Sequence, residues 1–255
     1  MPRFAANLTL LFKELLPVQR IAAAAQAGFA GCEILFPDGQ ELTGIRAELD
    51  QHGLGLALIN TPSFAKDGLP RAPAADPARI AEFRESFRRS LAIARDLRPD
   101  FIHVMSGPGE GGASRNCLIQ NLKWAAETAG DQRLTIEPIN RFDVPGYFLS
   151  DFDLALDILD AVGAPNLGLQ FDVYHAHKIS GAPLQVWQDT RQEVVHIQVG
   201  GIPDRNEPIA TGFDYPAFFK DLDAGGYSGW VSGEYNPATS TKAGLGWLTA
   251  ATGPG

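Results

Sequence analysis

The chain has 255 residues, a formal net charge of −9, and 45% hydrophobic and 20% charged residues. This composition supplies enough apolar side chains for a large core, and no apolar run reaches the roughly 18 residues that a membrane helix needs. The acidic balance is unfavourable for nucleic acid, because binding a polyanion depends on Lys and Arg that displace counterions. We therefore expect a globular protein with neither a nucleic-acid nor a membrane partner.

Short apolar runs alternate with longer segments of helical composition along the whole chain. We predict eight strands, at residues 3–7, 32–36, 56–60, 101–105, 134–137, 167–172, 194–199 and 230–234. The helices predicted between them span residues 18–27, 45–52, 77–97, 115–129, 151–161, 184–189 and 215–224, and a segment at 239–248 is predicted to close the ring.

Eight strand–helix units predict an α/β fold in which residues 1–250 form a single (β/α)8 TIM barrel. Residues 251–255 are expected to be a flexible C-terminal tail. The alternative is an open doubly wound sheet, which normally carries a glycine-rich turn after its first strand. Here the first strand ends in Asn7-Leu8-Thr9-Leu10, without GxGxxG, and the barrel is therefore favoured.

The cysteines and the N-terminal sequence indicate the cellular compartment in which we expect the protein. The chain has two cysteines, Cys32 and Cys117, and they form no CxxC pair. Two thiols cannot build a disulfide framework, which is typical of a reducing compartment. Residues 1–7 run directly into alternating sequence, without the apolar segment of a secretory signal. We therefore expect a cytoplasmic protein.

Four predicted strands end in a side chain that offers an oxygen ligand. These side chains are Glu137, Asp172, Gln198 and Glu234, separated by 26 to 36 residues along the chain. Because barrel enzymes carry their reactive groups at the carboxyl ends of strands, we expect the four to share one rim. Each acid could instead cap a loop or pair with a surface cation. Neighbouring carboxylates about 4 Å apart repel by on the order of 4 kcal/mol per pair, which favours one divalent cation among them.

Oxygen ligands suit Mg²⁺ or Mn²⁺ better than zinc, which prefers nitrogen and sulfur.

Two further side chains are candidates for binding a substrate. His175 lies three residues beyond Asp172, in a predicted loop where it can hydrogen-bond a substrate oxygen. Arg205 lies in the loop after the seventh strand and is either the clamp for an anionic group or a solvated loop arginine.

Other features have simpler interpretations. His196 shares the strand parity of Gln198 and is either a core histidine or a site residue, whereas His103 is expected to be structural. The glycine-rich segment 107–112 lacks the GxxxxGK[ST] pattern of a phosphate loop, and we expect a flexible loop there.

At these residues the chain resembles the hydroxypyruvate isomerase family, within the xylose isomerase-like barrels. The similarity runs through nearly the whole length. It includes Arg3-Phe4-Ala5-Ala6-Asn7-Leu8, Glu137-Pro138-Ile139-Asn140, Gln170-Phe171-Asp172-Val173-Tyr174-His175, His196-Ile197-Gln198 and Gly233-Glu234-Tyr235-x-Pro237.

The resemblance implies a metal bound by Glu137, Asp172, Gln198 and Glu234, with Glu137 and Glu234 also serving as an acid–base pair. It implies a metal-dependent isomerase that interconverts hydroxypyruvate and tartronate semialdehyde by proton transfer through an enediolate. The partner would then be a small hydroxy or oxo acid, and a homo-oligomer remains open.

Several alternatives stay open. The start of the chain and Ala176-His177-Lys178-x-x-Gly181 also resemble 2-oxotetronate isomerases, and a ketose or sugar epimerase would use the same metal site. A non-catalytic binding protein on the same barrel is opposed by the intact four-residue set, and an abasic-site endonuclease by the acidic charge and the few histidines. The loop 61–73 and Asn236 depart from the family pattern, so the metal chemistry is better defined than the substrate.

Overall fold

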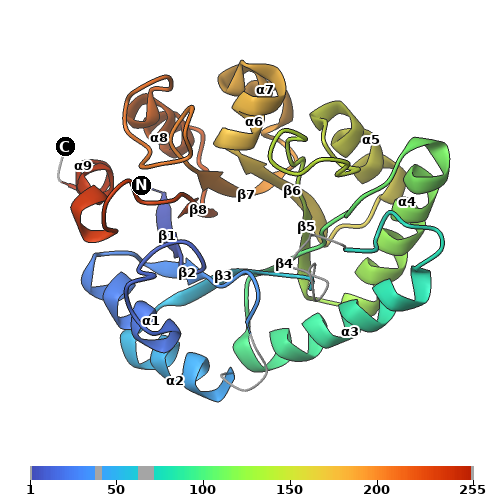
Figure 1. Ribbon diagram of the computed structural model, residues 1–255, viewed down its shortest axis with the longest axis horizontal. Helices are drawn as coiled ribbons and strands as arrows, with labels where there is room; N and C mark the ends of the chain where they lie inside the picture. The colour runs from blue at the N-terminus through green and yellow to red at the C-terminus, as the bar shows by residue number, and fades with distance from the viewer. Residues whose placement is uncertain (1, 38–41, 63–71, 254–255) are drawn as a thin grey trace. The chain divides into compact units, whose positions relative to one another are not determined.

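The structure is a computed structural model that describes residues 2–37, 42–62 and 72–253. In the described part, eight parallel strands alternate with helices and form a closed barrel in the order β1 to β8 (Figure 1). The predicted TIM barrel is therefore confirmed. None of the helices in these residues combines the length and the hydrophobicity needed to cross a membrane.

The elements follow the chain in strict alternation except at the sixth strand, which is followed by two helices. The strands are β1 (Arg3–Asn7), β2 (Gly31–Glu33), β3 (Gly55–Asn60), β4 (Phe101–His103), β5 (Arg133–Ile136), β6 (Leu167–Asp172), β7 (Val194–Val199) and β8 (Trp230–Gly233). Within the described residues the helices are α1 (Pro17–Gln26), α2 (Leu42–His52), α3 (Ile80–Leu97), α4 (Gly111–Ala129), α5 (Phe152–Val162), α6 (Val173–Ser180), α7 (Pro183–Thr190), α8 (Tyr215–Ala224) and α9 (Gly246–Thr252), with a 3₁₀ turn, η1, at Lys242–Gly244.

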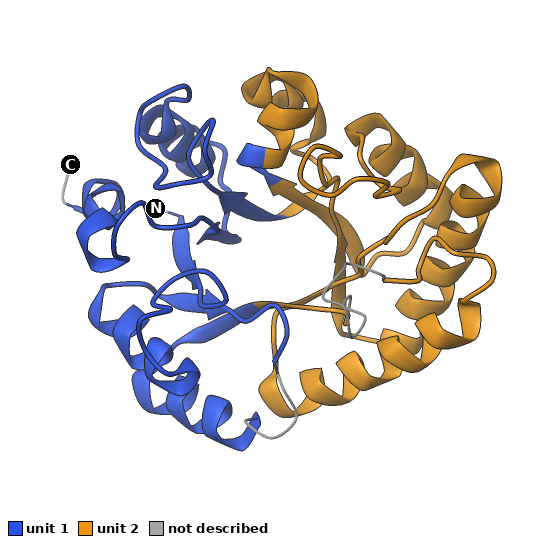
Figure 2. Ribbon diagram, in the orientation of Figure 1, with its two compact units in different colours: residues 1–57, 172–174, 196–255 blue, residues 58–171, 175–195 orange. Residues whose placement is uncertain are grey.

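The contacts of the chain define two compact units (Figure 2). Unit 1 comprises residues 1–57, 172–174 and 196–255, and unit 2 comprises residues 58–171 and 175–195. A single domain over residues 1–250 remains a prediction. Helix α9 extends to Thr252, and residues 254–255 lie outside the described residues, so the flexible tail at 251–255 also remains a prediction.

Each unit has its own aromatic core. In unit 1, the ring of Phe4 on β1 packs edge-on against Phe219 of α8 and Trp247 of α9, at centroid distances of 5.1 and 5.7 Å. In unit 2, Trp124 of α4 packs against Phe83 and Phe87 of α3, at 6.1 and 5.8 Å. These edge-to-face contacts join helices to strands or to each other and bury large apolar areas.

The glycine-rich segment after β4 differs from the flexible loop that we expected. The carbonyl oxygen of Gly107 accepts a hydrogen bond from the backbone N–H of Phe148 at 2.8 Å, and the Ser106 carbonyl accepts one from Ala75 at 2.9 Å. Helix α4 then begins at Gly111, four residues earlier than predicted. The segment is therefore held by backbone hydrogen bonds to two other parts of unit 2.

Gly107 provides a test of this packing. Its φ is +70°, and a Cβ atom on it would lie 1.5 Å from the carbonyl oxygen of Ala72. Because no side-chain rotation relieves that overlap, we expect Gly107→Ala to lower the free energy of unfolding by more than about 3 kcal/mol. Gly111 is a matched control, since its φ is +65° and a Cβ atom there meets nothing within 4 Å. Gly111→Ala should cost about 1 kcal/mol, and equal losses in urea denaturation would contradict the steric argument.

Candidate functional site

The four predicted oxygen ligands lie at the ends of their strands. Glu137 follows β5, Asp172 is the last residue of β6, Gln198 is the penultimate residue of β7, and Glu234 follows β8. All four are buried, with exposed fractions between 1% and 7%. Burying polar side chains in this way destabilises the folded protein unless protein groups or a ligand replace the lost water. The hydrogen-bond partners of each residue therefore show its role.

A fourth buried acid, Glu33, was not among the predicted site residues. Glu33, the last residue of β2, is fully buried. Its Oε2 accepts hydrogen bonds from the side-chain amides of Asn7 and Gln198, at 2.8 and 2.9 Å. Its Oε1 lies 2.5 Å from Nε2 of His196. We had extended this strand to residue 36, which placed Glu33 inside a strand, whereas β2 ends at Glu33 and is comparable with the other strand ends.

These contacts determine how Gln198 is oriented. Its Nε2 donates to Glu33, so its carbonyl oxygen is the atom that Gln198 can offer to a cation. His196 is fully buried and bonded to the same carboxylate, which makes it a core histidine. Glu33 thus positions a predicted metal ligand without being one of the four.

Arg205 brings two of the predicted ligands together within unit 1. Its Nη2 lies 3.3 Å from Oδ2 of Asp172 and 3.0 Å from Oε2 of Glu234. The guanidinium carbon also lies 5.0 Å from the centre of the Tyr174 ring. The arginine that was predicted to bind an anionic substrate is therefore bonded to two acids, and its cationic group offsets part of their mutual repulsion.

The protonation of Glu234 follows from its surroundings. The pKa of Glu234 is raised to about 8: burial is the largest cause, the Arg205 guanidinium opposes the rise, and charge repulsion from Asp172 and Glu33 adds to it. At neutral pH the Glu234 carboxyl group therefore holds its proton in the absence of a cation. A divalent ion supplies the missing positive charge, and its binding would displace this proton.

Glu137 lies in unit 2 and has its own set of partners. Its Oε2 accepts a hydrogen bond from Nε2 of Gln170 at 2.9 Å, and Oε1 of Gln170 in turn accepts one from the Thr135 hydroxyl at 3.0 Å. Nδ1 of His103 lies 3.6 Å from the same Oε2, while Nε2 of His175 lies 3.9 Å from Oε1. One oxygen of Glu137 is thus fixed by Gln170, and the other faces His175.

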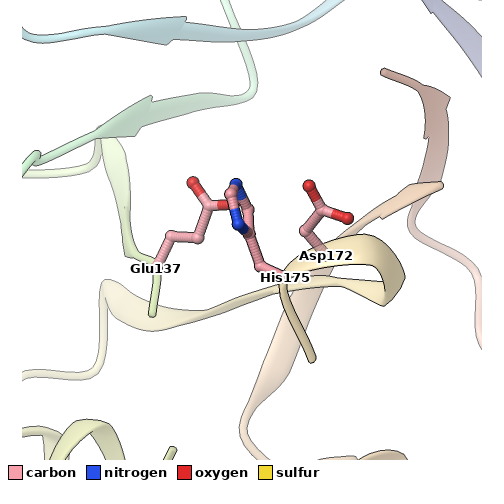
Figure 3. Close-up of side chains that lie close together, drawn as sticks. All are labelled: Glu137, Asp172 and His175. Carbon is pink, nitrogen blue, oxygen red and sulfur yellow. The ribbon is translucent and has the colours of Figure 1, made fainter. Parts of the chain in front are cut away.

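His175 lies in helix α6, not in the loop that was predicted for it. Helix α6 begins directly after β6, and the Asp172 carboxylate accepts a hydrogen bond from the backbone N–H of Tyr174 at 2.7 Å. One ligand atom each of Glu137, Asp172 and His175 lies within 4.8 Å of the other two (Figure 3). Figure 3 shows the Glu137 carboxylate beside the imidazole ring of His175.

A divalent cation fits the chemistry of these donors. Ligands on opposite sides of an ion that binds oxygen at about 2.1 to 2.4 Å are roughly 4 to 5 Å apart, and the ligand atoms of the cluster lie within 4.8 Å of one another. The carboxylates are buried, and the Glu234 proton marks charge that the protein side chains do not fully compensate. Of the residues that depart from the family pattern, Asn236 donates its backbone N–H to the Arg205 carbonyl at 2.8 Å, and residues 63–71 lie outside the described residues.

Comparison with known proteins finds a matching family and two similar proteins of named activity. Residues 21–251 match the model of the xylose isomerase-like TIM barrel family. A protein named 2-oxo-tetronate isomerase from Cupriavidus necator is 41% identical over 254 residues, which cover 97% of this chain and 98% of the relative. A protein named hydroxypyruvate isomerase from Escherichia coli is 35% identical, with the same coverage of both chains.

A solved structure has the same fold. The crystal structure of a protein named AP endonuclease, family 2, from Brucella melitensis superposes with a TM-score of 0.93 at 36% sequence identity. The superposition covers 98% of this chain and 99% of that one.

The hydrogen bonds of Glu33 predict a cost in stability. Glu33→Gln turns one of the two acceptor oxygens into an NH₂ group, which then faces either Nε2 of His196 or the side-chain amides of Asn7 and Gln198. We expect the free energy of unfolding to fall by about 1 to 3 kcal/mol, as when a buried hydrogen bond is lost. Chemical denaturation measures the loss. Glu85→Gln is the control, because the Glu85 side chain is 59% exposed. A Glu33 variant as stable as this control would disprove the assigned hydrogen bonds.

The raised pKa of Glu234 predicts proton release on metal binding. Because the pKa of Glu234 is about 8, the metal-free protein holds this proton at neutral pH, whereas a cation binds the deprotonated Glu234 carboxylate. Binding of Mn²⁺ should therefore release a proton near about pH 7 and none above about pH 9, and the apparent affinity should rise with pH until it levels off. Calorimetry in buffers of different ionisation enthalpy counts the protons. Glu234→Gln should abolish the release, and release that persists in this variant would assign the proton elsewhere.

Proposed function

The chain belongs to the xylose isomerase-like TIM barrel family, and on that premise we propose that it is an isomerase of small hydroxy and oxo acids. The reaction interconverts a 2-oxo-3-hydroxy acid and a 2-hydroxy-3-oxo acid. Hydroxypyruvate and tartronate semialdehyde are the three-carbon pair, and 2-oxotetronate belongs to the four-carbon pair. The observation that carries the proposal is the set of buried acids at strand ends, among which Glu234 has a raised pKa.

The residues that would hold the cofactor are Glu137, Asp172, Gln198 and Glu234. A divalent cation bound by these oxygens, Mg²⁺ or Mn²⁺, would act as a Lewis acid that stabilises negative charge developing on the substrate oxygens. Each of the four side chains is buried and lies at the carboxyl end of its strand, where barrel enzymes carry their sites. Hydrogen bonding of Gln198 to Glu33 supports its assignment, since it directs the amide oxygen away from Glu33.

Glu137 and Glu234 would move the carbon-bound proton. One carboxylate removes the proton from C3 of the 2-oxo acid, and the other carboxyl group returns a proton to C2, while O3 loses the proton that O2 gains. Glu234 suits this role because its carboxyl group is buried directly after β8, at the end of the strand where barrel enzymes carry their reactive groups. Glu137 suits the partner role because Gln170 fixes one of its oxygens and thereby the plane of the carboxylate.

His175 and Arg205 would bind the substrate. His175 faces Oε1 of Glu137 at 3.9 Å, so its ring can contact an oxygen of a molecule that Glu137 also contacts. Arg205 is 21% exposed, and it carries the positive charge that a carboxylate substrate needs. On substrate binding, the guanidinium would exchange part of its contact with Asp172 and Glu234 for the substrate carboxylate.

The relatives bear on the length of the substrate that we propose. The relative named for the four-carbon acid is more similar to this chain, at 41% identity, than the one named for hydroxypyruvate, at 35%. We therefore place a 2-oxotetronate first and hydroxypyruvate second. The chemistry at C2 and C3 is the same for both acids.

A substrate panel on defined protein tests the proposal. Metal-stripped protein is incubated with 2-oxotetronates, hydroxypyruvate and free ketoses, with and without Mg²⁺ or Mn²⁺, and products are identified by NMR. We expect metal-dependent isomerisation of the acids. Glu137→Gln and Glu234→Gln should each lower kcat by about 100-fold or more, because positioned acid–base groups contribute at least that much.

One control variant and two alternative outcomes make this result specific. Glu85→Gln removes an exposed carboxylate and should leave kcat unchanged. Near-normal kcat in both the Glu137 and the Glu234 variants would refute their roles. Turnover of free ketoses alone would retain the metal chemistry but make the chain an epimerase or a sugar isomerase.

A further inference from the structure

The side-chain amide of Asn140 has a defined orientation in unit 2. Asn140 lies three residues after Glu137 and is fully buried. Its Oδ1 accepts hydrogen bonds from the backbone N–H groups of Phe142 and Asp143, at 3.1 and 3.0 Å. Backbone N–H groups only donate, so the atom that they contact must be the amide oxygen. The NH₂ group of Asn140 therefore points the other way.

That NH₂ group meets His175. Nδ2 of Asn140 lies 2.7 Å from Nδ1 of His175 and 3.0 Å from Oδ2 of Asp143. The backbone N–H of Asn140 also points to Nδ1 of His175, at 3.4 Å. Two N–H groups converge on one ring nitrogen, so this nitrogen must accept, and the proton of the neutral imidazole lies on Nε2.

We propose that Asn140 is a positioning residue that fixes His175 as the neutral Nε2–H tautomer. In this form the ring donates a hydrogen bond from Nε2, the atom that faces Glu137, and it cannot bind a metal through that atom. The tautomer assignment depends on the contacts of Asn140 alone, whereas the role of the donor in catalysis rests on the proposed function.

The proposal reassigns one member of the cluster in Figure 3. Histidines that bind metal through Nε2 usually donate Nδ1–H to a carboxylate or a carbonyl oxygen. His175 has the opposite arrangement, because Nδ1 receives hydrogen bonds from Asn140. A proton on Nδ1 would meet two N–H groups, so both the other neutral tautomer and the imidazolium are disfavoured. The metal ligands are then oxygen atoms only.

In the reaction, the Nε2–H group supplies a hydrogen bond to a substrate oxygen that gains negative charge. Such a donor stabilises the enediolate more than the ground state, since the charge on that oxygen grows during proton transfer. Loss of this donor should therefore lower kcat and leave KM little changed, because the donor stabilises the enediolate more than the bound substrate.

The hydrogen bond can be reversed without changing the charge of the site. In the double variant Asn140→Asp/Asp143→Asn, a carboxylate at position 140 accepts from Nδ1–H of His175, and an amide at position 143 donates to that carboxylate. We expect His175 to change from the Nε2–H to the Nδ1–H tautomer. The matched control is Asp143→Asn alone, which keeps the Asn140 amide and should keep the Nε2–H tautomer.

Long-range ¹⁵N–¹H correlation NMR of the metal-free protein, labelled at histidine, reads the tautomer directly. The chain has five histidines, and the His175 signals are those that disappear in His175→Gln. An Nδ1–H tautomer in the wild-type protein would overturn the proposal, and this spectrum does not depend on whether the double variant folds. An unchanged Nε2–H tautomer in a folded double variant would overturn the positioning role of Asn140.

Two further measurements test the consequences. The Mn²⁺-loaded protein should show no electron spin echo modulation from a directly bound imidazole nitrogen, and such a signal would contradict the proposal. The double variant should lose at least about tenfold in kcat, as expected for one lost donor to a developing anion, with KM little changed.

If the wild-type ring is the Nε2–H tautomer but no acid is isomerised, the assignment stands and the proposed function fails. Full activity of a double variant with the Nδ1–H tautomer would refute the donor role instead.

Discussion

Buried carboxylates are the constraint on which the rest of this site depends. Each must replace its lost water by protein donors, by a proton or by a cation. Glu33 is satisfied by three side-chain donors that hold both of its oxygens. Glu234 is buried beside Asp172, and the Arg205 guanidinium offsets only part of the cost, so its pKa is raised. The difference makes Glu33 a fixed structural acid and leaves Glu234 able to exchange a proton near neutral pH.

Uncharged amides determine which atoms these acids present. Gln170 and Gln198 each donate an N–H to a glutamate, Glu137 in unit 2 and Glu33 in unit 1. Their amide oxygens differ, because Oε1 of Gln170 accepts from the Thr135 hydroxyl. Gln170 therefore has donor and acceptor both engaged within the protein, which suits a structural residue. Gln198 directs its oxygen away from Glu33, which suits a ligand.

Hydrophobic periodicity predicted the strands well because it is a local signal, and β1, β6 and β7 have the predicted bounds. Helix α6 was missed because it follows β6 without a loop, and Val173 and Tyr174 are also favourable in strands. Glu33 was missed for a different reason. Its partners His196 and Gln198 are 163 and 165 residues away in sequence, and local patterns contain no information about such pairs. The existence of the strands could be predicted, whereas the end of β2 and the hydrogen-bond partners of Glu33 could not.

Two residues of the site, Asp172 and Asn140, also hold the backbone that follows them in sequence. Asp172 accepts the backbone N–H of Tyr174 and so stabilises the start of α6, where the helix dipole favours a negative charge. The same carboxylate is bonded to Arg205, whose guanidinium also contacts Glu234. Asn140 likewise holds its own loop through two backbone N–H groups before its NH₂ group reaches His175. In both cases one side chain fixes the local backbone and a functional neighbour at once, so a change at either position moves the backbone and the chemistry together.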